Sequence, residues 1–123
     1  MSYEITIYAG IVVDRPWSGD VHKWLIKRAI LEMGAWGYDS ALYTLKPQDD
    51  DPHVFFYADD GDTEISTDKY GTELRAMSIK RVVEALEADC GIDRHWSLAC
   101  LREMQRMAAD NWRDDIRVVL FGH

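Results

Sequence analysis

Both ends of the chain have the hydrophobic patterns of β-strands. The stretch 3–13 reads YEITIYAGIVV, and Ile5, Ile7 and Ala9 fall on one face of it. This period of two is typical of a half-buried strand. The last stretch, 116–123, reads IRVVLFGH. Because it is almost continuously apolar, we expect it to be a strand in the interior of the sheet.

Three segments between these strands have the repeat of an α-helix. In residues 19–33, Leu25, Ala29 and Met33 lie on one apolar arc, Ser18 can cap the start, and Gly34 follows the end. The segments 72–90 and 94–110 have similar arcs, and in the second of them Cys100, Leu101, Met104, Met107 and Ala108 are expected to face inward. The sequence therefore predicts three helices.

Three short strands are predicted in the middle of the chain, over residues 40–45, 53–58 and 63–67. The last two flank the sequence DDGD, residues 59–62, in which Gly61 can supply the positive φ of a tight turn. The order of elements is then β-α-β-β-β-α-α-β. It predicts one α+β domain over residues 1–123, a two-layer sandwich of three helices on a mainly antiparallel sheet of about five strands. The pattern leaves the strand order open.

The negative charge of the chain is concentrated in one segment. The net charge is −8, and residues 47–68 hold eight of the 22 acids but no Lys or Arg. The fourteen acids that remain equal the fourteen Lys and Arg of the chain. Such a field repels nucleic acid and attracts basic surfaces, so we expect no direct nucleic-acid binding. The eight acids are Asp49, Asp50, Asp51, Asp59, Asp60, Asp62, Glu64 and Asp68.

Two interpretations of these acids stay open. Acidic loops keep proteins soluble, and this alone would account for them. Alternatively, carboxylates spaced along one edge of the sheet imitate the phosphates of a nucleic acid and occupy a basic groove on a protein partner. On this second interpretation, the residues that steer association are Asp49, Asp50, Asp51, Asp59, Asp60 and Asp62.

Trp24 and Leu31 form a second candidate contact. Both lie off the main apolar arc of the predicted first helix, one above the other across two turns. Tryptophan is frequent at the centres of protein interfaces, so the pair could be an exposed binding patch. The alternative is a core contact in which Trp17 packs over the same helix.

The sequence lacks most motifs that indicate catalysis. Its two cysteines, Cys90 and Cys100, lack zinc-ligand spacing and are expected to be reduced cytoplasmic thiols. Phosphate-binding glycine loops and a serine nucleophile elbow are both missing, and we expect no cofactor and no membrane-spanning helix.

Two chemical alternatives remain. His22 lies within the apolar arc of the predicted first helix, and with Asp20 or Asp39 as its orienting carboxylate it could serve as the base of a small enzyme. The turn Asp59–Glu64 could bind a divalent cation, although its glycine and glutamate do not have EF-hand spacing.

The sequence thus favours a non-enzymatic, acidic binding protein of the cytoplasm. We expect an inhibitor or adaptor that docks on a basic, nucleic-acid-binding protein, in outline like the small antagonists of host defence that phages and mobile elements encode. Pairing of open sheet edges would allow a dimer, but the sequence does not decide the oligomeric state.

Overall fold

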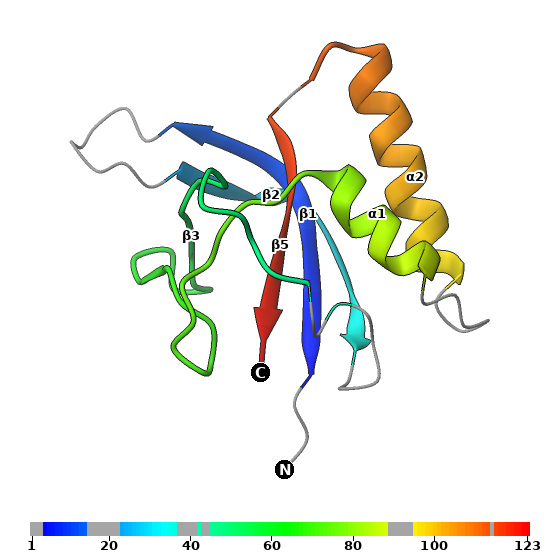
Figure 1. The fold of residues 1–123 in the computed structure, drawn as a ribbon. Helices are drawn as coiled ribbons and strands as arrows, with labels where there is room; N and C mark the ends of the chain where they lie inside the picture. Colours follow the sequence, from blue (N-terminus) through cyan, green and yellow to red (C-terminus); the bar gives the residue numbers. More distant parts are fainter. Residues whose placement is uncertain (1–3, 15–22, 37–41, 43–44, 89–94, 114) are drawn as a thin grey trace.

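The computed structural model describes residues 4–14, 23–36, 42, 45–88, 95–113 and 115–123. For residues 26–36 and His95 it describes the backbone alone. Within these ranges the fold is α+β, with a five-stranded mixed sheet and two helices (Figure 1). The elements are β1 (Ile5–Asp14), β2 (Lys23–Trp36), β3 (Val54–Tyr57), β4 (Glu64–Ile65), α1 (Ile79–Ala88), α2 (His95–Asp110) and β5 (Ile116–Gly122).

The strands lie in the order β4-β3-β2-β1-β5. β1 pairs antiparallel with both β2 and β5, and β3 pairs antiparallel with β4. The pairing of β2 with β3 is parallel, through Lys23 with Val54 and Trp24 with Phe55. The sheet is therefore mixed, and the expectation of a mainly antiparallel sheet omitted this pair.

β5 is at the end of this order, so the prediction of an interior strand was wrong. Its apolar sequence has another cause, because both of its faces are covered. Val118 packs on the helix side, and Val119 and Phe121 pack on the opposite side. The outer edge of β5 is also occupied, since Met77 and Val118 exchange backbone hydrogen bonds of 2.7 and 2.9 Å.

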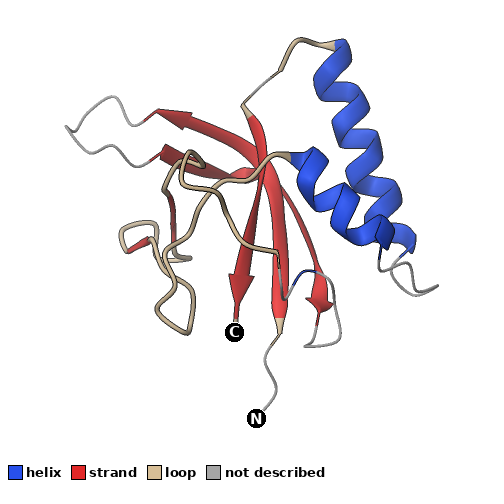
Figure 2. Cartoon of the chain, viewed as in Figure 1, coloured by secondary structure: helices blue, strands red, loops and turns tan. Residues whose placement is uncertain are grey.

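The two helices cover one face of the sheet (Figure 2). Their buried side chains meet those of β1 and β5 in one core, in which Ile7, Val82 and Leu101 are fully buried. A second core fills the other face, where the sheet curls around Tyr8, Phe56 and Phe121. The segment 73–77 bridges the two sides of this curl, because Arg75 pairs with His53 before β3 and Met77 pairs with β5.

The largest error of the sequence prediction is the first helix, expected over residues 19–33. Residues 23–36 form the strand β2, and residues 15–22 lie outside the described part of the chain. β2 pairs with β1 from Ile5 opposite Trp36 to Asp14 opposite Lys23, with two irregularities of register. The helical spacing of its apolar residues was a weak preference, and pairing with β1 overrides it.

The other predicted helices differ in their bounds. α1 begins at Ile79 rather than near residue 72, because Leu74 and Ala76 lie in the extended segment that bonds back to residues 52–54. α2 agrees with the prediction over residues 94–110, but Cys100 and Met107, expected to face inward, are exposed. The described helices are therefore two and not three.

The strand predictions for the middle of the chain are partly confirmed. β3 and β4 lie within the predicted ranges 53–58 and 63–67, joined by the predicted turn. Of the strand predicted over 40–45, only Leu42 and Leu45 are described, and neither lies in a strand. In the described part of the chain, neither helix has both the length and the apolar composition needed to cross a membrane.

Candidate acidic binding surface

The turn between β3 and β4 is built by its own polar groups. Gly61 adopts a φ of +77°, and its N–H donates to the carbonyl of Ala58 at 2.9 Å. The carboxylate of Asp60 accepts hydrogen bonds from the backbone N–H groups of Asp62 and Thr63, both at 2.9 Å, and from the Thr63 hydroxyl at 2.6 Å. The turn is thus held in one conformation although it is exposed to solvent.

The same hydrogen bonds stabilise the charged form of Asp60. The Thr63 hydroxyl, followed by the backbone N–H groups of Thr63 and Asp62, lowers the pKa of the Asp60 carboxyl to about 2. Hydrogen bonds donated to a carboxylate always act in this direction. Asp60 therefore remains ionised at any physiological pH.

Around Asp60, the turn presents further carboxylates to solvent. Asp59 and Asp62 are exposed on either side of Gly61, and Glu64 is exposed on β4. From Asp59 to Asp68 the chain contributes five carboxylates and no Lys or Arg. We call the segment from Asp59 to Glu64 the acidic hairpin.

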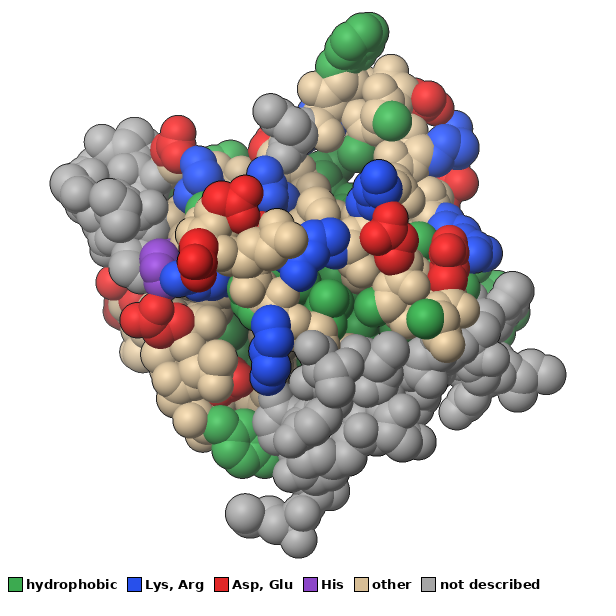
Figure 3. Space-filling view, in the orientation of Figure 1, with side chains coloured by type: hydrophobic (Ala, Val, Ile, Leu, Met, Phe, Trp, Pro, Cys, Tyr) green, Lys and Arg blue, Asp and Glu red, His purple; other side chains and the backbone are tan. Residues whose placement is uncertain are grey.

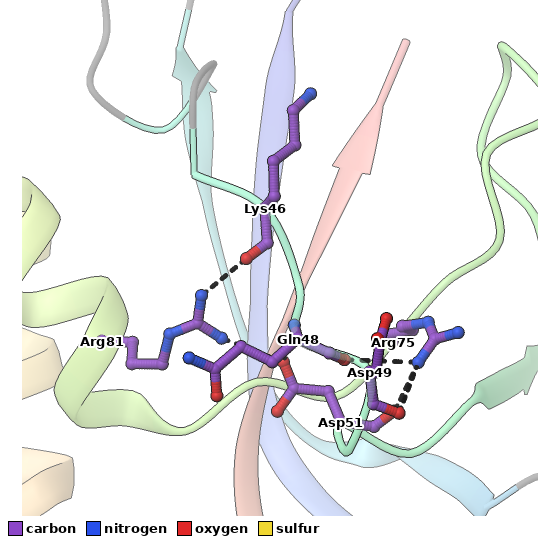
Figure 4. A network of polar contacts seen from close by, with 6 residues as sticks. All are labelled: Lys46, Gln48, Asp49, Asp51, Arg75 and Arg81. Atoms are coloured by element: carbon purple, nitrogen blue, oxygen red, sulfur yellow. Dashed lines mark hydrogen bonds and ion pairs between the residues drawn. The ribbon is translucent and has the colours of Figure 1, made fainter.

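The other predicted acidic cluster, Asp49 to Asp51, has a different structure (Figure 4). Asp51 is only 8% exposed. Its carboxylate accepts a hydrogen bond of 2.7 Å from the Gln48 N–H and one of 2.9 Å from Nη1 of Arg81 on α1. The carboxylate of Asp51 thus joins the loop to α1 and is not available to a partner.

Two guanidinium groups reach the loop 46–51 from distant positions. Nη1 of Arg75 lies within 3.0 to 3.3 Å of the carbonyl oxygens of Gln48, Asp49 and Asp51. Nη2 of Arg81 donates to the Lys46 carbonyl at 2.6 Å. Together with Lys46, these cations equal the three carboxylates of the loop in number.

The fold therefore corrects the picture of an acidic segment without counter-charge. That description holds along the sequence but not in space, because Arg75 and Arg81 fold back onto the loop. Lys and Arg side chains are interspersed with carboxylates across the face that Figure 3 presents. The acidic hairpin, by contrast, contains four carboxylates and no Lys or Arg in its own sequence.

The two acidic segments lie at opposite ends of β3. β3 has four residues, which separate the loop from the hairpin by at least ~13 Å. β3 and β4 also form one side of the sheet. Asp49 and Asp50 are exposed at one end of this side, and Asp59, Asp60 and Asp62 at the other.

The structure removes the helical repeat on which the predicted patch of Trp24 and Leu31 was based. Both belong to β2, where their partners on β1, Val13 and Ala9, are four positions or about 13 Å apart. The ring of Trp24 is partly buried and meets Tyr57 edge to face, with centroids 5.9 Å apart. Leu31 pairs with Ala9, and its side chain lies outside the described part.

The residues of the enzyme alternative, His22, Asp20 and Asp39, lie outside the described residues, as does Cys90. Among the side chains that are described, no three His, Cys, Asp or Glu are placed to hold a metal ion. The cation-binding and enzymatic alternatives therefore stay predictions from sequence.

Four residues that bind the acidic loop or are exposed near the ends of α2 were not identified from the sequence. Arg75 and Arg81 were missed because they are 24 and 30 residues from Asp51, and no local pattern links them. Trp96 and Trp112 are 78% and 93% exposed, whereas the tryptophan predicted as a candidate contact was Trp24. The position of Trp112, directly after a helix end marked by Asp110 and Asn111, was the available signal.

No family model, no curated protein and no solved structure matches this chain.

Proposed function

We propose that this chain is a non-enzymatic binding protein that docks on a basic protein surface through its acidic hairpin. The observation that carries the proposal is the combination of clustered carboxylates and fixed geometry in one exposed turn. Asp60 holds the turn through three hydrogen bonds, while Asp59 and Asp62 are exposed beside it. A preformed contact loses little conformational entropy when it binds.

The distribution of charge favours the hairpin over the loop 46–51 as the principal contact. A partner with a basic surface meets Arg75 and Arg81 beside the loop, and like charges across an interface are unfavourable. At the hairpin, the carboxylates of Asp59, Asp60 and Asp62 act together. Asp49 and Asp50 then contribute to long-range steering rather than to direct contact.

The chemistry of the partner follows from these carboxylates. Carboxylates held along a strand end are suited to a groove lined with Lys and Arg, such as a groove that otherwise binds phosphates. The function supported best is therefore that of an inhibitor or adaptor of a nucleic-acid-binding protein. Direct contact with nucleic acid is disfavoured by the net charge of −8.

The proposal is tested with three baits in a pull-down from extract of the source cells. The first is wild type, the second carries Asp59→Asn and Asp62→Asn, and the third carries Asp49→Asn and Asp50→Asn. Both variants remove two charges and leave in place the hydrogen bonds that Asp60 makes in the turn and Asp51 makes in the loop. Equal melting temperatures would confirm that all three are folded.

We expect a basic partner to be retained by wild type and by the loop variant, and to be lost from the hairpin variant. Retention of the same partner by all three baits would contradict the proposal and would mean that the acidic residues serve only the solubility of the protein. Loss from the loop variant alone would place the contact at Asp49 and Asp50.

A further inference from the structure

Two hollows of similar size lie beside β5, and the charges that line them differ. The first has a volume of about 390 Å³, and its lining pairs two acids, Asp14 and Asp115, with two bases, Lys23 and Arg117. The second has a volume of about 330 Å³ and lies between the start of α1, the end of α2 and β5 (Figure 1). The described residues of its lining include three bases and no acid. We call this second site the cationic hollow.

The surface beneath the cationic hollow is apolar. Ile79 at the start of α1 and Ala108 near the end of α2 line the hollow and are only 5% and 7% exposed. Ile116 of β5 also lines it and packs against the core under the helices. An apolar group that enters the hollow therefore covers hydrophobic side chains and is itself removed from water.

The three bases of the cationic hollow are Lys80, Arg113 and Arg117. Arg113 donates from Nε and Nη2 to the two carboxylate oxygens of Asp115, at 2.7 and 3.0 Å. Because a guanidinium carries five N–H donors, this pair fixes the group and leaves Nη1 available to another acceptor. Lys80 lies 4.0 Å from Glu84 in an exposed pair, which is a weak contact that a ligand can replace.

Arg117 carries the least compensated of these charges. It is half-buried on β5, and none of the carboxylates in the described part of the chain forms an ion pair with it. We propose that the cationic hollow binds a small organic carboxylate, with its charged group against Arg117 and Arg113 and its apolar body on the hydrophobic surface below. The planar fork of a guanidinium matches the two oxygens of a carboxylate. This site is independent of the proposed role of the acidic hairpin.

The class of ligand follows from the charges around the hollow. A carboxylate in the neighbouring hollow would face Asp14 and Asp115, and contact between like charges is unfavourable. A dianion is disfavoured in the cationic hollow, because Asp115 and Glu84 offset part of its positive charge and the chain as a whole carries −8. Physiological salt screens the distant acids beyond about 8 Å, so the bases in contact decide the binding of a single negative charge. The volume lies near the lower limit for ligand sites, and we expect a dissociation constant on the order of 0.1–1 mM.

The test is a titration of the isotope-labelled full chain with hexanoate, followed through the backbone amide chemical shifts in NMR spectra. Hexanoate should cause saturable shifts at Ala108, Ala109 and Ile116, which line the hollow. Hexanamide has the same apolar body without the charge. It should bind at least about tenfold more weakly, because it cannot form the charge-assisted hydrogen bonds.

Two pairs of variants test the charges of the hollow. Arg117→Gln should weaken hexanoate binding about tenfold. Lys69→Gln is its matched control and should bind as wild type does, because exposed Lys69 lies at the opposite end of β5, where its N–H donates to the Gly122 carbonyl. The second pair does not depend on the folding of Arg117→Gln, since it changes Ala109, an exposed helical residue of the lining. Ala109→Glu should bind hexanoate at least about tenfold more weakly than Ala109→Gln, which has the same shape without the charge.

Three results would overturn the assignment of this site. One is the absence of saturable shifts at the lining amides up to ~10 mM hexanoate. Another is equal affinity for hexanoate and hexanamide, which would make the hollow an apolar surface without selectivity for anions. The third is a failure of either pair of variants to differ, which would mean that the bases of the hollow do not hold the carboxylate.

Discussion

Asp51 offers the sharpest test of how the loop before β3 is held. Replacing Asp51 with Ala removes the acceptor of two hydrogen bonds, from the Gln48 N–H at 2.7 Å and from Arg81 at 2.9 Å. It also removes the ion pair that links the loop to α1. Arg81 keeps its bond to the Lys46 carbonyl, so its charge loses one partner and not both.

The size of the stability loss expected for Asp51→Ala follows from the burial of the Asp51 and Arg81 side chains. Breaking a buried ion pair by removing one partner costs about 3–5 kcal/mol. The side chain of Asp51 is 9% exposed, but that of Arg81 is 23% exposed and is partly solvated after the change. We therefore expect the free energy of unfolding to fall by about 2–3 kcal/mol. For a chain of this length, the melting temperature should fall by about 10 °C.

The assay is thermal and urea unfolding of wild type, Asp51→Ala, Arg81→Met and the double variant. The two single changes should be non-additive, because both remove the same ion pair. The exposed Asp49→Ala is the control and should change the free energy of unfolding by less than about 0.5 kcal/mol. A loss below ~0.5 kcal/mol for Asp51→Ala, or additive single changes, would refute the proposed role of Asp51.

Three further changes test the hairpin turn and the core. The fold lowers the pKa of Asp60 to about 2, so the charged form of Asp60 stabilises the protein above the pKa of this group in the unfolded chain, and this stabilisation is lost as the pH falls through 2. The difference in melting temperature between wild type and Asp60→Asn should therefore shrink between about pH 5 and 2. Gly61→Ala puts a Cβ on a residue with φ +77° and should destabilise the protein by about 1 kcal/mol, measured by urea unfolding, even though nothing lies within 4 Å of that Cβ. Leu101→Ala leaves a cavity at a side chain that is 0% exposed and should lower the free energy of unfolding by about 2–5 kcal/mol in the same assay. Met107→Ala changes an exposed side chain and should lower it much less.

The elements predicted well from sequence are those whose local signals agree with their surroundings. The turn after β3 was predicted because Gly61 and its neighbouring acids favour that geometry wherever the turn lies. β1 was predicted because one face of it, with Ile5, Ile7 and Ala9, is buried under the helices. α2 was predicted in its bounds, and Leu101 and Ala108 in their burial.

The predictions from sequence failed where contacts with distant parts of the chain determine the structure. Residues 23–36 contain Leu, Ala and Met at helical spacing, but β1 supplies a long strand partner that a local pattern does not reveal. The same holds for β5, which is apolar because two separate cores cover its faces and not because strands flank it.

At the candidate site, too, features set by local sequence could be predicted and features set by distant contacts could not. Exposure of Asp59, Asp60 and Asp62 could be predicted from their place in a turn. The burial of Asp51 could not, because it depends on Arg81, which arrives from α1. Pairing across such distances is fixed only by the packing of the whole domain.

The most direct test of the acidic hairpin is the rate at which the captured partner associates with it. The measurement is the association rate constant at low and high ionic strength for wild type, for Asp59→Asn with Asp62→Asn, and for Asp49→Asn with Asp50→Asn. We predict a fall of about tenfold for the hairpin variant at low salt, a smaller fall for the loop variant, and convergence of all three at high salt. Equal rates for wild type and the hairpin variant at low salt would contradict the account.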